Sequence, residues 1–106
     1  MILVARSRDK LESVAKEIRS GGGEAEPEEC DMSCRESVVT MAQRVITKYG
    51  VPDLIVNNAG CYYIQQFCDK DYDSWERMIS LNIMGYLVLI GEFINPMKVR
   101  SIELTK

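Results

Sequence analysis

The feature that most restricts the fold of this chain is the alternation of short, branched apolar runs with longer segments of helical periodicity. Residues 1–5 (MILVA) and 53–56 (DLIV) fit strands that are buried on both faces. Apolar residues recur at helical spacing in 11–18 and 38–49. Strands that alternate with helices form parallel sheets with right-handed crossovers. We therefore expect an α/β chain of order β-α-β-α-β-α-α.

Turn and capping residues mark the ends of the first two helices. Residues 20–23 (SGGG) end the first, because glycine readily takes the left-handed conformation that follows a helix. Residues 24–32 hold the position of the second strand, and Pro27 makes it an edge or irregular strand. Residues 33–36 (SCRE) match a capping box that opens the second helix, and Gly50 closes it.

The C-terminal part is predicted to be helical after a loop. The expected segments are a loop at 61–70, a helix at 71–80, a second helix at 85–93, and a tail at 99–106 with no clear pattern. Asn95-Pro96 is expected to end the second of these helices, because proline cannot donate a backbone hydrogen bond. No internal repeat divides the chain, so residues 1–106 are expected to form a single partial domain.

Composition excludes several classes of protein. The net charge is −3 and acids and bases are interspersed, so we expect no nucleic-acid partner, which would need a basic stripe. The apolar run Tyr86–Ile90 is too short to span a bilayer, and MILVA is too short for the apolar region of a signal peptide. We therefore expect a cytoplasmic protein with no membrane segment.

Four cysteines and no histidine limit the available chemistry. Cys30, Cys34, Cys61 and Cys68 do not have the spacing of a structural zinc site, so no metal site is expected. The absence of histidine excludes Ser-His-Asp and Cys-His nucleophiles. A thiol or metal site formed by the four cysteines, with a reactive thiol at Cys30 or Cys34, is kept as a minor alternative.

Residues that follow the predicted strands point to a nucleotide. In an open parallel sheet, ligands bind at the carboxyl ends of the strands. The residues expected at this edge are Arg6 and Ser7, Asp31 and Met32, and Asn58, Ala59 and Gly60. A guanidinium binds phosphate, a carboxylate accepts from an adenine amino group, and a glycine lets the backbone approach a sugar.

Five stretches resemble the short-chain dehydrogenase/reductase family in its classical form. They are LVARSRDKL at 3–11, CDM at 30–32, DLIVNNAG at 53–60, WERMISLNIMG at 75–85 and PMKVR at 96–100. The resemblance implies a partial, Rossmann-like, doubly wound parallel sheet that binds NAD(P). It also implies an oxidoreductase that transfers hydride between a nicotinamide cofactor and a small carbonyl or secondary alcohol.

The resemblance assigns cofactor roles to residues at the strand ends. An acid at the end of the first strand would favour NAD. Here that strand ends in alanine and is followed by Arg6, which would favour the 2′-phosphate of NADP, so NADP is expected in preference to NAD. Asp31 and Met32 match the pair that borders the adenine, although Asp31 would equally suit a helix cap. The alternative for Arg6 is a solvated turn residue that binds no cofactor.

The resemblance places two further features at the centre of the site. Asn58, Ala59 and Gly60 match the turn beside the cofactor's ribose, with Asn57 tying the strand ends together. Asn82 matches the family's active-site asparagine, which holds a break in a helix and fixes a water in a proton relay. Without the family resemblance, Asn82-x-x-Gly85 would indicate only a simple kink in a helix.

Other family features are not found in the sequence. There is no glycine-rich turn that would hold the pyrophosphate, and no tyrosine is followed four residues later by a lysine. The chain is therefore interpreted as an internal fragment, lacking the first strand and the C-terminal half, that folds poorly alone. Catalysis is expected of the parent, a homo-oligomer, and is left open for this chain. The alternative is a catalytically inactive truncated product that acts as a weak nucleotide-binding or interaction module.

Overall fold

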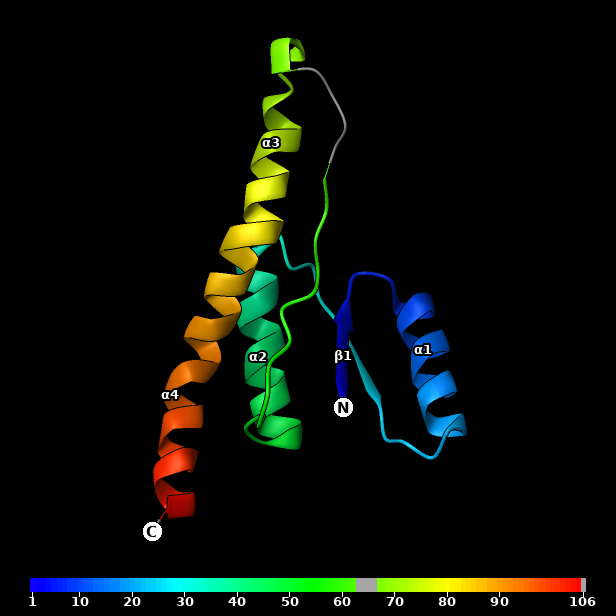
Figure 1. Cartoon of the computed structure of the whole chain (residues 1–106), viewed down its shortest axis with the longest axis vertical. Helices are drawn as coiled ribbons and strands as arrows, with labels where there is room; N and C mark the ends of the chain where they lie inside the picture. The colour runs from blue at the N-terminus through cyan, green and yellow to red at the C-terminus, as the bar shows by residue number, and fades with distance from the viewer. Residues whose placement is uncertain (63–66, 106) are drawn as a thin grey trace. The chain divides into compact units, whose positions relative to one another are not determined.

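The computed structural model describes residues 1–62 and 67–105 of the chain (Figure 1). They belong to two compact units, Met1–Asp31 and Met32–Lys106. The first unit holds the sheet and one helix, and the second is built from helices and an extended segment. Each unit is described by itself.

The first unit is a β-α-β arrangement. β1 (Ile2–Ala5) leads into α1 (Arg8–Ser20), which is followed by β2 (Glu26–Glu29). The two strands pair in parallel, with Pro27 opposite Leu3. Each strand of a two-stranded sheet has a free edge, so Pro27 can be accommodated although it lacks a backbone donor. The strand expected within 24–32 is therefore formed, at Glu26–Glu29, and it is an edge strand of the described sheet.

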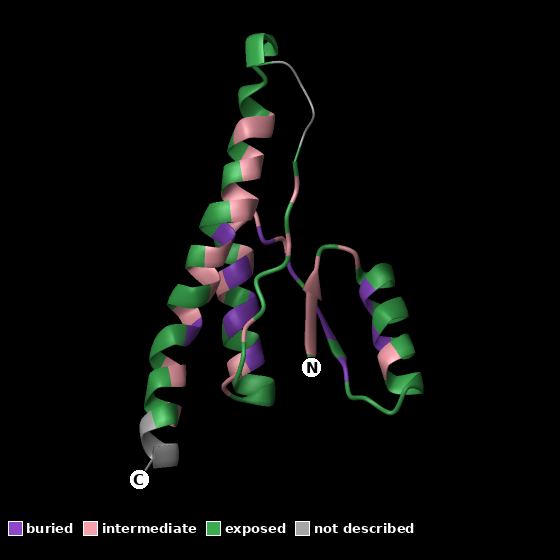
Figure 2. Cartoon of the chain, in the orientation of Figure 1, coloured by how far each residue is buried: buried purple, intermediate pink, exposed green. Residues whose placement is uncertain are grey.

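Helix α1 covers the sheet with a narrower apolar face than its periodicity predicts. Leu11 and Ala15 are buried, whereas Val14 is 45% exposed (Figure 2). The predicted stop is confirmed: Gly21 caps the helix and Gly22 has a φ of 88°, the left-handed conformation that glycine takes without strain.

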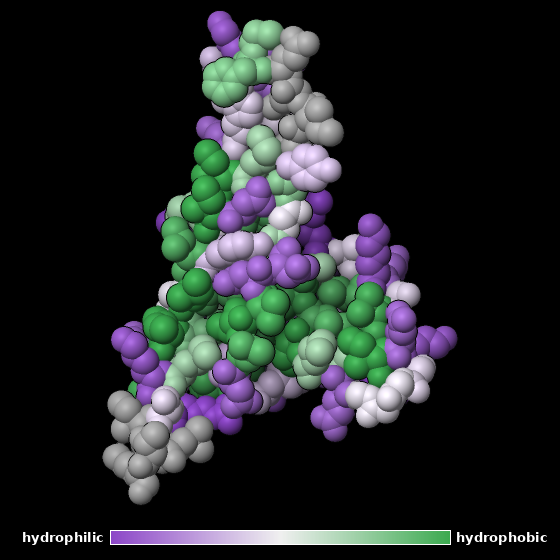
Figure 3. Space-filling model, in the orientation of Figure 1, coloured by the Kyte–Doolittle hydropathy of each residue, from purple (hydrophilic) through white to green (hydrophobic). Residues whose placement is uncertain are grey.

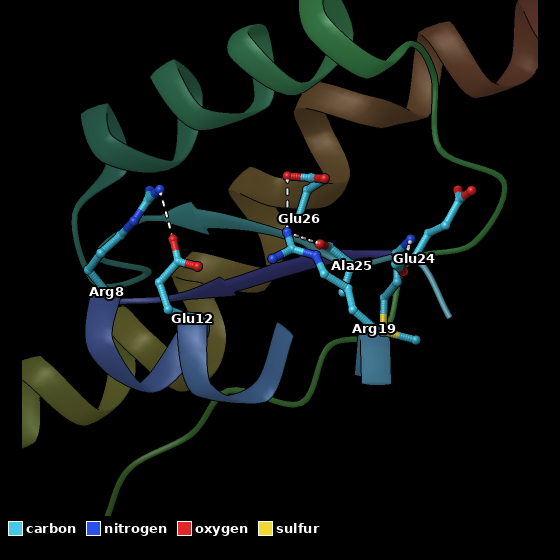
Figure 4. Close-up of polar contacts among 7 residues, drawn as sticks. Arg8, Glu12, Arg19, Glu24, Ala25 and Glu26 are labelled. Carbon is cyan, nitrogen blue, oxygen red and sulfur yellow. Dashed lines mark hydrogen bonds and ion pairs between the residues drawn. The ribbon is translucent and has the colours of Figure 1, made fainter. Parts of the chain in front are cut away.

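Polar contacts tie the end of α1 to the start of β2. The Arg19 guanidinium donates to the carbonyl oxygen of Ala25 at 2.5 Å and lies 3.4 Å from a carboxylate oxygen of Glu26 (Figure 4). The amino group of Met1 donates to the carbonyl of Glu24 at 3.1 Å. These contacts fix the turn that returns the chain to the sheet.

The second unit is built around two packed helices. Its elements are α2 (Arg35–Tyr49), the short 3-10 helix η1 (Phe67–Asp69), α3 (Tyr72–Ile79), the π-helical turn η2 (Ser80–Met84) and α4 (Gly85–Thr105). Helix α2 packs against α4. Their buried apolar residues are Val38, Met41, Ala42 and Val45 of α2 and Phe93 of α4 (Figure 2).

The start of α2 differs from the predicted capping box. The helix begins at Arg35 with Cys34 as its N-cap, so Ser33 is not the capping residue. Cys34 makes no side-chain bond to the helix backbone; its thiol instead donates to a carboxylate oxygen of Glu36 at 3.5 Å. The predicted end is confirmed at Gly50, which has a φ of 91°.

The predicted third strand is not formed. Residues 53–56 lie in an extended segment that pairs with no strand among the described residues, and Leu54 and Val56 are 77% and 74% exposed. In the doubly wound order, the family's first strand lies between this segment and β1. The sheet of the described residues contains β1 and β2, and this segment pairs with neither.

The prediction that a helix ends at Asn95-Pro96 is wrong. Helix α4 continues through Pro96 to Thr105. Proline removes one hydrogen bond from the helix but does not prevent tertiary contacts from holding the next turn. Arg100 supplies such contacts: its guanidinium donates to the carbonyl of Val51 at 2.6 Å and pairs with Asp53 at 2.8 Å.

The helix from α3 to α4 leaves many apolar residues exposed. The two predicted helices are joined by η2 into one helical stretch, along which Figure 3 shows apolar side chains. Its large exposed residues include Ile79, Ile83, Leu87, Ile90 and Ile94. By length and composition alone, Tyr72–Ser101 could cross a membrane, a test that a helix packed against protein also passes. The short run Tyr86–Ile90 therefore belongs to a much longer apolar helix.

Candidate functional site

Within the first unit, two of the predicted site segments reach the same edge of the sheet. Arg6 and Ser7 follow β1, and Asp31 follows β2. The N–H of Cys30 donates to the carbonyl of Ala5 at 2.9 Å, so the parallel pairing continues beyond the strands. Because parallel strands end at a common edge, Arg6 and Asp31 both lie where the sequence predicts the adenosine end of a cofactor.

Arg6 and Ser7 have different local roles at this edge. The Ser7 hydroxyl oxygen accepts from the backbone N–H of Lys10 at 3.5 Å and caps α1. Arg6 is exposed and has no hydrogen bond or ion pair within the described parts of the chain. Its guanidinium is therefore available to an anion.

Within the second unit, Asn82 binds the segment that follows Asn58-Ala59-Gly60. Its amide oxygen accepts from the N–H of Cys61 at 2.9 Å, and its amide nitrogen donates to the carbonyl of Cys61 at 2.7 Å. Asn82 lies in the middle of η2, a π-helical turn. A π-helical turn inside an α-helix is frequent at functional sites.

Gly85, three residues after Asn82, allows a close approach to the segment that follows β2. A Cβ atom at Gly85 would lie closer than 3.0 Å to the carbonyl oxygen of Met32, a distance that real Cβ atoms essentially never show. It would also lie 3.3 Å from the carbonyl oxygen of Ser80. Only glycine fits here without a shift of the backbone.

Tyr86 makes a further link to the same loop. Its hydroxyl donates to the carbonyl oxygen of Ala59. In the sequence, Tyr86 belongs to an apolar run whose pattern does not predict this role. The signal that could have found it is its position four residues after Asn82, because residues at that spacing share one helix face.

The turn itself presents exposed groups. Asn57, Asn58 and Gly60 are exposed, and Ala59 is half-buried. A Cβ at Gly60 would meet only the amide oxygen of Asn82, at 3.4 Å. The predicted tie from Asn57 involves no side-chain hydrogen bond with the residues that the structure describes, so it stays a prediction.

A small cavity lies beside this junction. It has a volume of about 190 Å³ and is lined by Met32, Ser33, Arg35, Glu36, Ser80, Met84, Gly85 and Val88. A hydrogen bond from its own backbone, and then one from the Cys34 thiol, lower the pKa of Glu36 below the ordinary value. The cavity is thus lined by charges of both signs, Arg35 and Glu36, and by apolar side chains that include Met84 and Val88.

The cysteines form no disulfide in the described parts of the chain. No group of three potential metal ligands gathers among the described residues. Cys61 takes part in the site through its backbone, which the spacing of the cysteines does not predict. The minor alternative of a reactive thiol at Cys30 or Cys34 stays a prediction.

Comparisons with known proteins identify the class. The sequence profile of the short chain dehydrogenase family matches residues 1–102, so the chain belongs to this family. An uncharacterized oxidoreductase of Mycobacterium tuberculosis (strain ATCC 25618 / H37Rv) is 36% identical over 106 residues. That match covers 94% of this chain and 31% of the relative, so the chain spans about a third of the relative's length.

Solved structures support the same class. A metagenomic short-chain oxidoreductase in complex with NADP is 32% identical, with a TM-score of 0.85 over 91% of this chain and 44% of that one. An alcohol dehydrogenase from Thermococcus sibiricus complexed with 5-hydroxy-NADP is 31% identical, with a TM-score of 0.83 over 92% and 42%. These similarities confirm the predicted α/β, Rossmann-like class, of which this chain covers a part.

Proposed function

We propose that this chain supplies the adenosine- and ribose-side wall of an NADP-dependent oxidoreductase that acts on a small carbonyl compound or secondary alcohol. The observation that carries the proposal is the hydrogen-bonded pair of Asn82 and Cys61, which ties the family's helical asparagine to the end of its Asn-Asn-Ala-Gly turn. The NADP complexes among the similar structures support the choice of cofactor.

Arg6 is the residue proposed to select NADP. Its guanidinium is exposed beside the N-terminus of α1, and the absence of an acid at the end of β1 removes repulsion of a phosphate. Asp31 and Met32 would border the adenine, and Asn58, Ala59 and Gly60 the ribose. When bound, the nicotinamide supplies the hydride.

Asn82 would act as a positioning residue. Both polar atoms of its side chain are bonded to the main chain of Cys61, so the side chain would hold the turn beside the cofactor. Residues outside this chain would donate the proton, because none of its tyrosines is followed four residues later by a lysine.

The test starts from the complete gene product that contains this chain. A glycine-rich turn before Met1 and a Y-x-x-x-K after Lys106 in the transcript would support the proposal, and their absence would refute it. Arg6→Ser should then weaken NADPH binding roughly tenfold or more and leave NADH binding unchanged, because a charge-assisted bond to phosphate is lost. Arg8→Ser is the matched control, since Arg8 pairs with Glu12 at 3.2 Å.

A second candidate is a non-catalytic module. The observation that favours it is that the sequence holds neither the glycine-rich turn nor the Y-x-x-x-K pattern. In that case the 106-residue chain should bind NADPH no more tightly than about millimolar, because no helix N-terminus would hold the pyrophosphate. Micromolar binding in a calorimetric titration would rule this candidate out.

A further inference from the structure

Asn82 and Tyr86 together hold one short stretch of main chain. Asn82 occupies both the N–H and the carbonyl of Cys61, and Tyr86 donates to the carbonyl of Ala59. The two side chains are four residues apart on a helix, a rise of roughly 6 Å. Their targets are two residues apart in an extended segment, which spans roughly 6.6 Å.

The rise between the two helix side chains matches the distance between their two main-chain targets. A strand at the edge of a sheet is bonded at similar intervals. In an extended segment, the main-chain groups of alternate residues point to the same side, so those of Ala59 and Cys61 can face one partner. Here the partner is a pair of helix side chains.

We propose that Tyr86 is a second positioning residue, which completes with Asn82 a two-rung side-chain ladder that sets the Asn58–Cys61 turn against the cofactor. This inference rests on the proposed function. Asn82 alone fixes one end of the turn, at Cys61, and would leave Ala59 free to rotate about Gly60. The hydroxyl of Tyr86 removes that freedom, so its effect falls on cofactor binding and not on the packing of α2 against α4.

Tyr86→Phe tests this in the complete gene product, because it removes only the hydroxyl. Tyr72→Phe is the matched control: Tyr72 lies in α3, is 60% exposed, and its hydroxyl has no partner in the described parts of the chain. Deuterium exchange of the peptide that covers residues 57–62 should become about three- to tenfold faster in Tyr86→Phe, as expected for one lost hydrogen bond. Tyr72→Phe should leave it unchanged.

The affinity for NADPH would not change if Tyr86 had only a structural role. The NADPH dissociation constant, followed by cofactor fluorescence, should rise about three- to tenfold in Tyr86→Phe. The midpoint of thermal unfolding should stay within about two degrees of the wild type, because the buried residues of α2 and α4 are untouched. Equal NADPH affinity in Tyr86→Phe and Tyr72→Phe would overturn the inference.

The two proposals fail in different ways. If the wild type binds no NADPH, the proposed function fails, while the exchange measurement still decides whether the ladder exists. If the wild type binds NADPH but its turn peptide exchanges at the rate of an unstructured chain, the inference fails and the proposed function stands. Tyr86→Phe combined with Asn82→Ala should speed exchange non-additively, because both side chains hold one segment. Additive effects would contradict the ladder.

Discussion

Asn82 and Cys61 are joined by two hydrogen bonds of opposite direction, at 2.9 Å and 2.7 Å, although they are 21 residues apart in the chain. The asparagine amide thereby pairs with both the N–H and the carbonyl of Cys61, as the backbone of a neighbouring strand would. The third strand predicted at residues 53–56 pairs with no other strand in the described parts of the chain. This pair is therefore a main constraint on the turn that follows.

Asn82→Ala should lower the free energy of unfolding by about 1–3 kcal/mol, because it leaves a partly buried N–H and carbonyl without partners. Asn95→Ala makes the same substitution at an exposed site in α4 and should change stability by less than about 0.5 kcal/mol. Urea denaturation followed by circular dichroism measures both. Similar losses for the two variants would contradict the assigned role of Asn82.

Gly85→Ala and Gly91→Ala should change stability in opposite directions. A methyl group at Gly85 would collide with the Met32 carbonyl, which should cost about 1–3 kcal/mol. A methyl group at Gly91 meets nothing within 4 Å, so the better helix propensity of alanine should add up to about 1 kcal/mol. Thermal and urea unfolding of the two variants give the comparison. A stabilising Gly85→Ala would show that α4 and the Met32 backbone are not in contact in solution.

Arg100→Met should release the loop after α2, since the guanidinium binds both the Val51 carbonyl and the Asp53 carboxylate. Asp53 is largely exposed, so Asp53→Asn should cost no more than about 1 kcal/mol and its effect should shrink in high salt. Arg100→Met should cost more, because it also leaves the Val51 carbonyl unpaired. If the two variants cost the same at every salt concentration, the bond to Val51 contributes nothing.

The Glu36 carboxylate should make stability depend on pH in the acid range. Its own backbone hydrogen bond, and then the Cys34 thiol, lower the pKa of Glu36 in the folded chain. A lowered folded pKa means that the contribution is present above the ordinary value and is lost as pH falls through the folded pKa. Carbon-13 NMR titration should show the pKa of Glu36 moving back toward its ordinary value in Cys34→Ala. An unchanged titration would indicate that the thiol does not donate.

Local signals in the sequence predicted much of the fold. The glycines at 21–23 and Gly50 end their helices as expected, because Gly22 and Gly50 can take the left-handed conformation without strain. The start of α2 was misplaced by one residue at Cys34, because Ser33 and Cys34 can both occupy the extended conformation of an N-cap. For the site, the sequence indicated the residues at the ends of β1 and β2 and the segment around Asn82.

The sequence by itself determined the family, the order of the first elements and the candidate residues, because these depend on residue type and short spacing. The tertiary structure alone decided that residues 53–56 lie outside the sheet and that α4 continues past Pro96. It also decided that Tyr86 meets Ala59 and that Gly85 meets Met32. The reason is physical: each of these outcomes depends on which groups distant in the chain are available as partners, and local residue type does not fix that.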